Sequence, residues 1–133
     1  MKIYGIGTDI VSVDRIKKSL KNKNFIIKLF CKEEMAKCNK LVNSYNCYAK
    51  RFAAKEAFSK ALGTGIASGI NFNEIIIMNE KSGKPFIKLS GKTMQIIKKK
   101  FKKKPKIALT LSDEKKYAVA FVTISLWCLK KLN

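Results

Sequence analysis

The chain has 133 residues, 47% of them hydrophobic, which fits one globular domain with a core of its own. It carries 29 lysines and arginines against 9 aspartates and glutamates, and no histidine, for a formal net charge of +20. The lack of histidine excludes Ser-His-Asp and Cys-His catalysis and histidine zinc sites, so proton transfer must use a carboxylate, a lysine, a tyrosine or water.

The N-terminal segment is predicted to begin with a strand and continue as short helices. The apolar segment 2–8 is typical of a buried strand, and its glycines allow another backbone to approach closely. A short helix is expected from Ile10, with Asp9 near its N-terminus. Two further short helices are expected over 25–30 and 32–41.

The clearest helix is the segment 44–62, where alanine and phenylalanine recur at three- to four-residue spacing until Gly63-Thr64-Gly65 ends it. Strands then predominate. We expect them over 72–78, 86–89, 106–112 and 117–125, with a turn at Ser82-Gly83-Lys84-Pro85 and a lysine-covered helix over 93–101. The predicted fold class is therefore α+β: one domain over 1–133, with a small, mostly antiparallel sheet packed against one long and several short helices.

The cysteines and the apolar segments bear on the compartment. Cys31, Cys38, Cys47 and Cys128 show no CxxC spacing and fit neither a zinc site nor a disulfide framework, so we expect reduced thiols. The N-terminus lacks the apolar region of a signal peptide, and the longest apolar stretch, 117–129, is too short to span a bilayer. We expect a cytoplasmic protein with no membrane insertion.

Two carboxylates, Asp9 and Glu56, stand among small and apolar residues. An ionised carboxylate in such a place is costly unless a cation compensates it. If the two side chains meet, a hard divalent cation such as Mg²⁺ fits, because it takes oxygen ligands from one or two carboxylates plus substrate phosphates. If they do not, Asp9 is a helix N-cap and Glu56 pairs with Lys60 one turn later.

The segment from Gly5 to Val11 and the run from Arg51 to Ile66 closely resemble the holo-[acyl-carrier-protein] synthases, the small 4′-phosphopantetheinyl transferases. Gly83-Lys84-Pro85 and the segments 109–113 and 117–120 extend the resemblance, in order, over nearly the whole chain. It implies transfer of 4′-phosphopantetheine from coenzyme A to a serine of an acidic apo-acyl carrier protein, in support of fatty acid biosynthesis, with release of adenosine 3′,5′-bisphosphate. It also implies Mg²⁺ and a homotrimer with active sites between subunits.

The same resemblance implies roles for single residues. Asp9 and Glu56 match the metal ligands. Lys60 matches the lysine near the transferred phosphate, where it stabilises developing charge or protonates the leaving group. Arg15 matches the basic residue that meets the carrier protein. The residues implied to bind coenzyme A are Gly63, Thr64, Gly65, Lys84, Pro85 and Asp113.

Several of these residues also have a purely structural interpretation. Lys60 fits a solvated lysine, Gly63 a helix C-cap, and Lys84 an ordinary turn residue. Phe25 fits a contact with the carrier or, better, a core position. Asp113 stands where some relatives carry histidine and others aspartate, so the general base stays open between Asp113, a water held by Glu56 and a metal-bound water.

The charge also suggests a different class, a basic nucleic-acid-binding module, because lysines cluster over 98–104. Such modules interleave aromatic with basic residues and present a recognition element. Here only Phe101 interrupts the cluster, and this interpretation leaves Asp9 and Glu56 without a role. We therefore favour the transferase, with no nucleic-acid partner, and interpret the lysine cluster as a solvated helix face.

Overall fold

Most of the predicted elements are present in the computed structural model, which describes residues 1–63 and 69–128. Its α+β composition confirms the predicted fold class. The elements are β1 (Lys2–Ser12), α1 (Val13–Ser19), α2 (Lys23–Leu29), α3 (Lys32–Asn39), α4 (Ser44–Leu62), the 3₁₀ helix η2 (Phe72–Glu74), β2 (Ile75–Asn79), β3 (Pro85–Leu89), α5 (Gly91–Lys100), β4 (Lys106–Asp113) and β5 (Tyr117–Leu126).

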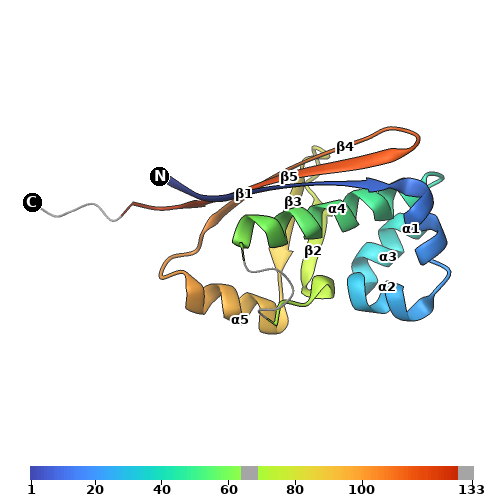
Figure 1. Cartoon of the computed structure of the whole chain (residues 1–133). Coiled ribbons are helices and arrows are strands. Elements are labelled where there is room, and N and C mark those ends of the chain that lie inside the picture. The colour runs from blue at the N-terminus through green and yellow to red at the C-terminus, as the bar shows by residue number, and fades with distance from the viewer. Residues whose placement is uncertain (64–68, 129–133) are drawn as a thin grey trace, which may run out of the picture.

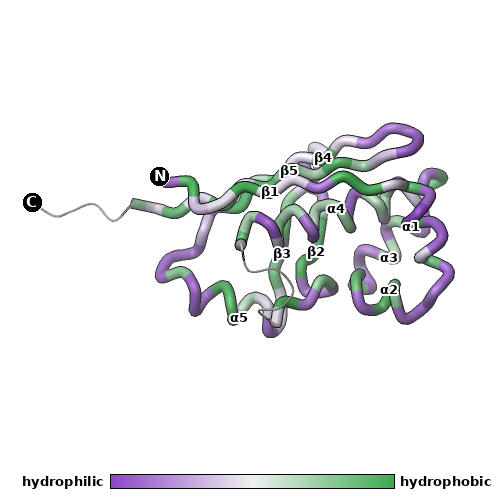
Figure 2. The backbone as a smooth tube through the Cα atoms, viewed as in Figure 1, coloured by the Kyte–Doolittle hydropathy of each residue, from purple (hydrophilic) through white to green (hydrophobic). Residues whose placement is uncertain are grey.

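The strands form two antiparallel sheets, one in the order β1-β5-β4 and one a hairpin of β2 and β3. Figure 1 shows the long helix α4 against one face of the three-stranded sheet, with α1, α2 and α3 at one end of the molecule and α5 at the other. In Figure 2 hydrophobic residues follow α4 and the strands, while the turn between β4 and β5 is hydrophilic. The core therefore lies between α4 and the sheets.

Two glycines let α4 lie directly on β1. A Cβ atom built on Gly5 would overlap the carbonyl oxygen of Ala61, and one built on Gly7 would overlap that of Ala57. Both alanines are buried. Glycines on the strand thus pack against alanines on the helix, and the two backbones come close together. This contact also fixes which residues of α4 face the end of β1.

Strand β1 is longer than predicted, and this changes the position of Asp9. Its pairing with β5 continues to Ser12, which lies opposite Tyr117. Helix α1 therefore starts only at Val13, and Ser12 is its N-cap, with a side chain that accepts a hydrogen bond from the backbone N–H of Arg15. The prediction of a helix from Ile10 was wrong, and so was the alternative that Asp9 caps it. Asp9 lies within the strand.

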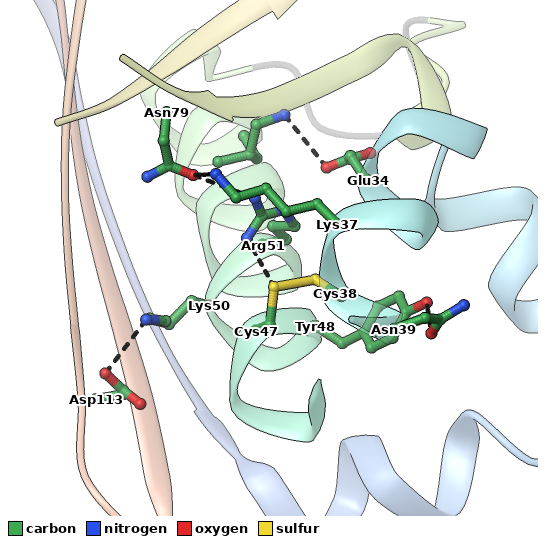
Figure 3. Close-up of a disulfide and its surroundings, with 11 residues drawn as sticks. Glu34, Lys37, Cys38, Asn39, Cys47, Tyr48, Lys50, Arg51, Asn79 and Asp113 are labelled. Atoms are coloured by element: carbon green, nitrogen blue, oxygen red, sulfur yellow. Dashed lines mark hydrogen bonds and ion pairs between the residues drawn. A yellow bond between two sulfur atoms is a disulfide. The ribbon is translucent and has the colours of Figure 1, made fainter. Parts of the chain in front are cut away.

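The expectation of reduced thiols was also wrong. Cys38 of α3 and Cys47 of α4 form a disulfide, with their Cα atoms 5.4 Å apart, as Figure 3 shows. The short connection between the two helices places these residues next to each other, which sequence spacing alone did not reveal. Cys31 and Cys128 are free. Among the described residues, no helix has the length and apolar character needed to cross a membrane.

Candidate active site

The close packing of α4 on β1 brings together the three residues predicted to be catalytic. The Nζ of Lys60 lies 3.1 Å from Oδ1 of Asp9 and donates a hydrogen bond to the carbonyl oxygen of Thr8 at 3.0 Å. Glu56 precedes Lys60 by one helical turn and is half-buried. The Lys60 side chain is 56% exposed and that of Asp9 only 15% exposed, so the site is open on the lysine side.

The two carboxylates are close enough to influence each other. Burial raises the pKa of Glu56, the negative charge of Asp9 raises it further, and the ammonium of Lys60 opposes both effects. Lys60 forms its ion pair with Asp9. The alternative from the sequence, a pair of Glu56 with Lys60 one turn later, is therefore wrong. The Oδ2 atom of Asp9 is buried and has no hydrogen-bond partner. One lysine therefore leaves the pair incompletely compensated.

This arrangement fits a magnesium ion better than a transition metal. The described residues contain no cluster of three or more histidines, cysteines and acids that could hold a metal by itself. Two neighbouring carboxylates, one of which has a buried oxygen without a partner, suit Mg²⁺. This ion commonly takes one or two protein carboxylates and completes its shell with water and substrate phosphates. Asp9 and Glu56 are the residues that would hold it.

The remaining predicted site residues lie elsewhere in the chain. Gly63 ends α4 in the left-handed conformation, with φ 78°, so its role as a C-cap is confirmed. Lys84 lies in the turn at the tip of the β2–β3 hairpin, Pro85 begins β3 beside it, and Arg15 is exposed on α1. Thr64 and Gly65 fall outside the described residues.

Asp113 does not join the carboxylate pair within one copy of the chain. It lies at the end of β4, where Oδ2 accepts a hydrogen bond from Asn46 at 2.9 Å and Oδ1 lies 3.4 Å from Nζ of Lys50. Both partners belong to the first two turns of α4, whereas Glu56 and Lys60 belong to its second half. An active-site role for Asp113 therefore needs a second copy.

The structure also shows the surroundings of Phe25, of Ser59, which precedes Lys60 on α4, and of the lysine cluster 98–104. Phe25 packs in the core with its ring centroid 6.2 Å from that of Phe52. Ser59 is buried. The lysines of the cluster 98–104 are exposed, while Phe101 among them is buried and packs edge-on against Tyr4.

Sequence reasoning missed a buried ion pair between Glu34 and Lys55, both with fully buried side chains. The Nζ of Lys55 lies 2.7 Å from Glu34 and donates to the carbonyl oxygens of Phe72 and Ile75 at 2.8 and 2.7 Å. Burial lowers the pKa of Lys55, and the charge of Glu34 opposes this. Lys55 stands three residues before the core residue Phe58, so helical periodicity contained the signal.

Comparison with known proteins places this geometry in context. Residues 5–122 match the 4′-phosphopantetheinyl transferase superfamily. The chain is 50% identical to a holo-[acyl-carrier-protein] synthase of Pelagibacter ubique over 125 residues, 93% of this chain and 98% of that protein. Its structure resembles the crystal structure of the synthase from Neisseria meningitidis, with a TM-score of 0.82 and 37% identity over 93% of this chain and 99% of that one. The synthase of Bacillus anthracis, solved in complex with CoA (3′,5′-ADP), matches with a TM-score of 0.76 and 33% identity over 93% and 97%.

Proposed function

The chain belongs to the holo-[acyl-carrier-protein] synthases of the 4′-phosphopantetheinyl transferase superfamily, and we propose that it acts through Asp9, Glu56 and Lys60 with Mg²⁺. As an enzyme of this family it transfers phosphopantetheine from coenzyme A to acyl carrier protein. The convergence of the three side chains, with a buried carboxylate oxygen free of any partner, supports the assignment of these residues.

The residues divide the work of a phosphoryl transfer. The serine hydroxyl of the carrier attacks one phosphorus of the coenzyme A diphosphate, and the bond from that phosphorus to the bridging oxygen breaks. Asp9 and Glu56 would hold Mg²⁺, which would neutralise part of the negative charge of the diphosphate. Lys60, held against Asp9, donates hydrogen bonds to the oxygens on which charge develops, or a proton to the leaving phosphate.

The serine proton needs an acceptor, and the three candidates stay open: a metal-bound water, a water held by Glu56, and Asp113. A water held by Glu56 lies within one copy of the chain, whereas Asp113 can act only from a neighbouring copy, since its own partners are Asn46 and Lys50. Both carboxylates agree with the absence of histidine, because a carboxylate can orient and deprotonate a hydroxyl or a water.

We assign the coenzyme A contacts to the end of α4 and to the tip of the β2–β3 hairpin. Gly63, Lys84 and Pro85 are the residues concerned in the described chain, with Thr64 and Gly65 as the proposed continuation. Lys84 is exposed and free to meet a phosphate. Two relatives in the solved structures, from Bacillus anthracis and Helicobacter pylori, are complexes with coenzyme A.

The carrier protein is proposed to approach over α1. Arg15, Lys17 and Lys18 are exposed there, and α1 follows directly on the strand that carries Asp9. Acyl carrier proteins are acidic, so a basic surface next to the site speeds their encounter more than it tightens the complex. We place the reaction in the cytoplasm.

We propose a homotrimer, each subunit a single domain, with active sites between subunits. The three-stranded sheet is covered by α4 on one face, and no described element covers the other (Figure 1). On that open face Ile6, Ile10 and Phe121 are 61%, 64% and 41% exposed. Burying such apolar surface against a second copy stabilises an assembly.

The test is transfer itself. The protein is incubated with coenzyme A, MgCl₂ and apo-carrier, and mass spectrometry follows the serine-linked adduct. Asp9→Asn and Glu56→Gln should reduce the rate by roughly a hundredfold or more, because each removes charge that the reacting diphosphate needs. Glu33→Gln is the matched control, since Glu33 is exposed on α3 and has no role in the proposed site. Undiminished transfer in the first two variants would place the metal elsewhere, and no adduct with the unaltered protein would refute the proposed reaction.

A further inference from the structure

We infer that Asn79, the last residue of β2, is a positioning residue that holds the hairpin tip in place for coenzyme A. Its Oδ1 accepts hydrogen bonds from Lys37 at 2.8 Å and Arg51 at 3.3 Å, and its Nδ2 donates one to the carbonyl oxygen of Gly83 at 3.0 Å. Figure 3 shows the amide of Asn79 against the ends of the Lys37 and Arg51 side chains. The inference rests on the proposed function, which assigns the tip, including Lys84, to coenzyme A.

The Arg51 part of this link is buried. Arg51 is only 4% exposed and also donates from Nη1 to Sγ of Cys47, at 3.0 Å, within the disulfide to Cys38. Within the described chain no carboxylate lies at ion-pair distance from Arg51, and its Nε is buried without a partner. Burial lowers the pKa of Arg51 and the charge of Glu34 opposes this. The guanidinium is thus held by α4 and finds neutral acceptors, of which the Asn79 oxygen is one.

These contacts explain why the residue is an asparagine. An amide has an acceptor on one side and two donors on the other. Because Lys37 and Arg51 carry only donors, the oxygen of Asn79 must face them, and the NH₂ group then faces Gly83. An aspartate would serve the two cations at least as well, but it has no proton to give to the Gly83 carbonyl. The amide is therefore the group that joins both sides.

Hydrogen bonds within the hairpin tip determine its shape, but a contact outside the tip is needed to fix its position relative to α4. The N–H of Gly83 donates to the carbonyl of Glu80, and the N–H of Glu80 donates to that of Lys84, both at 2.9 Å. Gly83 has φ 92°, in the left-handed region. These bonds set the form of the turn and not its distance from α4. Asn79 sets that distance through Arg51, which lies on the same helix as Glu56.

Two substitutions separate positioning from stability. Asn79→Asp keeps the acceptor for Lys37 and Arg51 and loses the donor to Gly83, so the melting temperature should stay the same or rise. Asn79→Leu loses both contacts, so the melting temperature should fall. In both variants we expect the KM for coenzyme A to rise about three- to tenfold, the effect of one lost hydrogen bond, with kcat within twofold and the KM for carrier unchanged. If Asn79 had only a structural role, the KM for coenzyme A would rise in Asn79→Leu, which melts at a lower temperature, and not in Asn79→Asp.

Asn73→Asp is the matched control. Asn73 also donates from Nδ2 to a carbonyl, that of Ile27 at 3.3 Å, but it lies on η2 and not at the tip. The same change of charge there should leave the KM for coenzyme A unaltered. Suppose that the unaltered protein transfers phosphopantetheine. If the KM for coenzyme A is then unchanged in both Asn79 variants, or rises only in the variant with the lower melting temperature, the inference is overturned while the proposed function stands. If the unaltered protein shows no transfer, the proposed function itself fails.

Discussion

Two acidic side chains of this protein, Glu34 and Asp9, are largely buried but differ in how completely their oxygens are used. Glu34 is buried, and its oxygens meet the ammonium of Lys55 and the backbone N–H groups of Cys31 and Ile77. Asp9 is also largely buried, yet one of its oxygens has no partner. Removing one member of a buried, saturated pair costs about 3–5 kcal/mol. A buried carboxylate left open serves binding instead, because an oxygen without a partner is available to a cation.

Glu56 gives a prediction about pH. Burial and the charge of Asp9 raise its pKa, and Lys60 opposes them. The folded protein therefore binds this proton more tightly than the unfolded chain does. The stability that this adds is fully present below the unfolded pKa and is lost as pH rises through the folded pKa. Glu56→Gln, which needs no ionisation, should melt at a higher temperature than the unaltered protein near pH 8, without metal, and the gap should shrink toward about pH 4.

Melting curves with and without MgCl₂ check this. A bound cation compensates the two carboxylates, so the ion should stabilise the unaltered protein and close the gap to Glu56→Gln at high pH. The half-saturating MgCl₂ concentration should rise as pH falls, because protons compete for Glu56. A gap that stays constant across pH and MgCl₂ would show that Glu56 does not feel Asp9.

At the level of elements, the site depends on the contact between β1 and α4. Gly5 and Gly7 face the helix, and the next residue on the same side of the strand is Asp9. The helix residues opposite the glycines are Ala61 and Ala57, so Glu56 lies next to Asp9. The alternation of the strand and the turn of the helix thus place the two carboxylates together without help from any loop.

Gly7→Ala should disrupt this contact. The added Cβ meets the carbonyl oxygen of Ala57, a backbone atom that cannot rotate away, so α4 must move from β1. We expect a loss of about 1–3 kcal/mol in the free energy of unfolding and transfer reduced by roughly a hundredfold, since small displacements of catalytic groups are costly. Denaturant unfolding and the transfer assay measure the two effects. Ile27→Val, at an exposed position of α2 away from this contact, should change neither. Near-normal activity in Gly7→Ala would mean that transfer does not require the close packing of α4 on β1.

At the level of the molecule, one face of a sheet remains apolar and open. Ile10 and Phe121 lie on it, on β1 and β5, and both are exposed in a single copy. The active site also lacks a nearby Asp113 within that copy. An assembly of several copies would bury this apolar surface, and Asp113 would then reach an active site only from a neighbouring copy.

Phe121→Asp should therefore weaken the assembly. A carboxylate on an apolar interface must be desolvated without a partner, which opposes association. Light scattering coupled to size-exclusion chromatography should show a smaller species, and transfer should fall with it. Ile27→Asp is the control, since Ile27 is 61% exposed but lies on α2, away from the sheet. A single-copy species for the unaltered protein, with full activity, would contradict the trimer.

The residues of the candidate site were largely predictable from the sequence, because Asp9, Glu56 and Lys60 stand in a specific motif and in elements whose periodicity is local. The helix 44–62 was predicted with its correct bounds for the same reason. The end of β1 was not, since its last residues stay in the strand only through pairing with β5, far away in the chain.

Other features could be learned only from the tertiary structure, because they depend on contacts between residues of different elements. The disulfide of Cys38 and Cys47, the buried pair of Glu34 and Lys55 and the link of Asn79 to Gly83 each join separate elements. Local pattern specifies which residues share a face of a helix or strand, and so it determined the chemistry available to this protein. It does not specify which face meets which, because that follows from how side chains of different elements fill one core, and only the folded chain shows it.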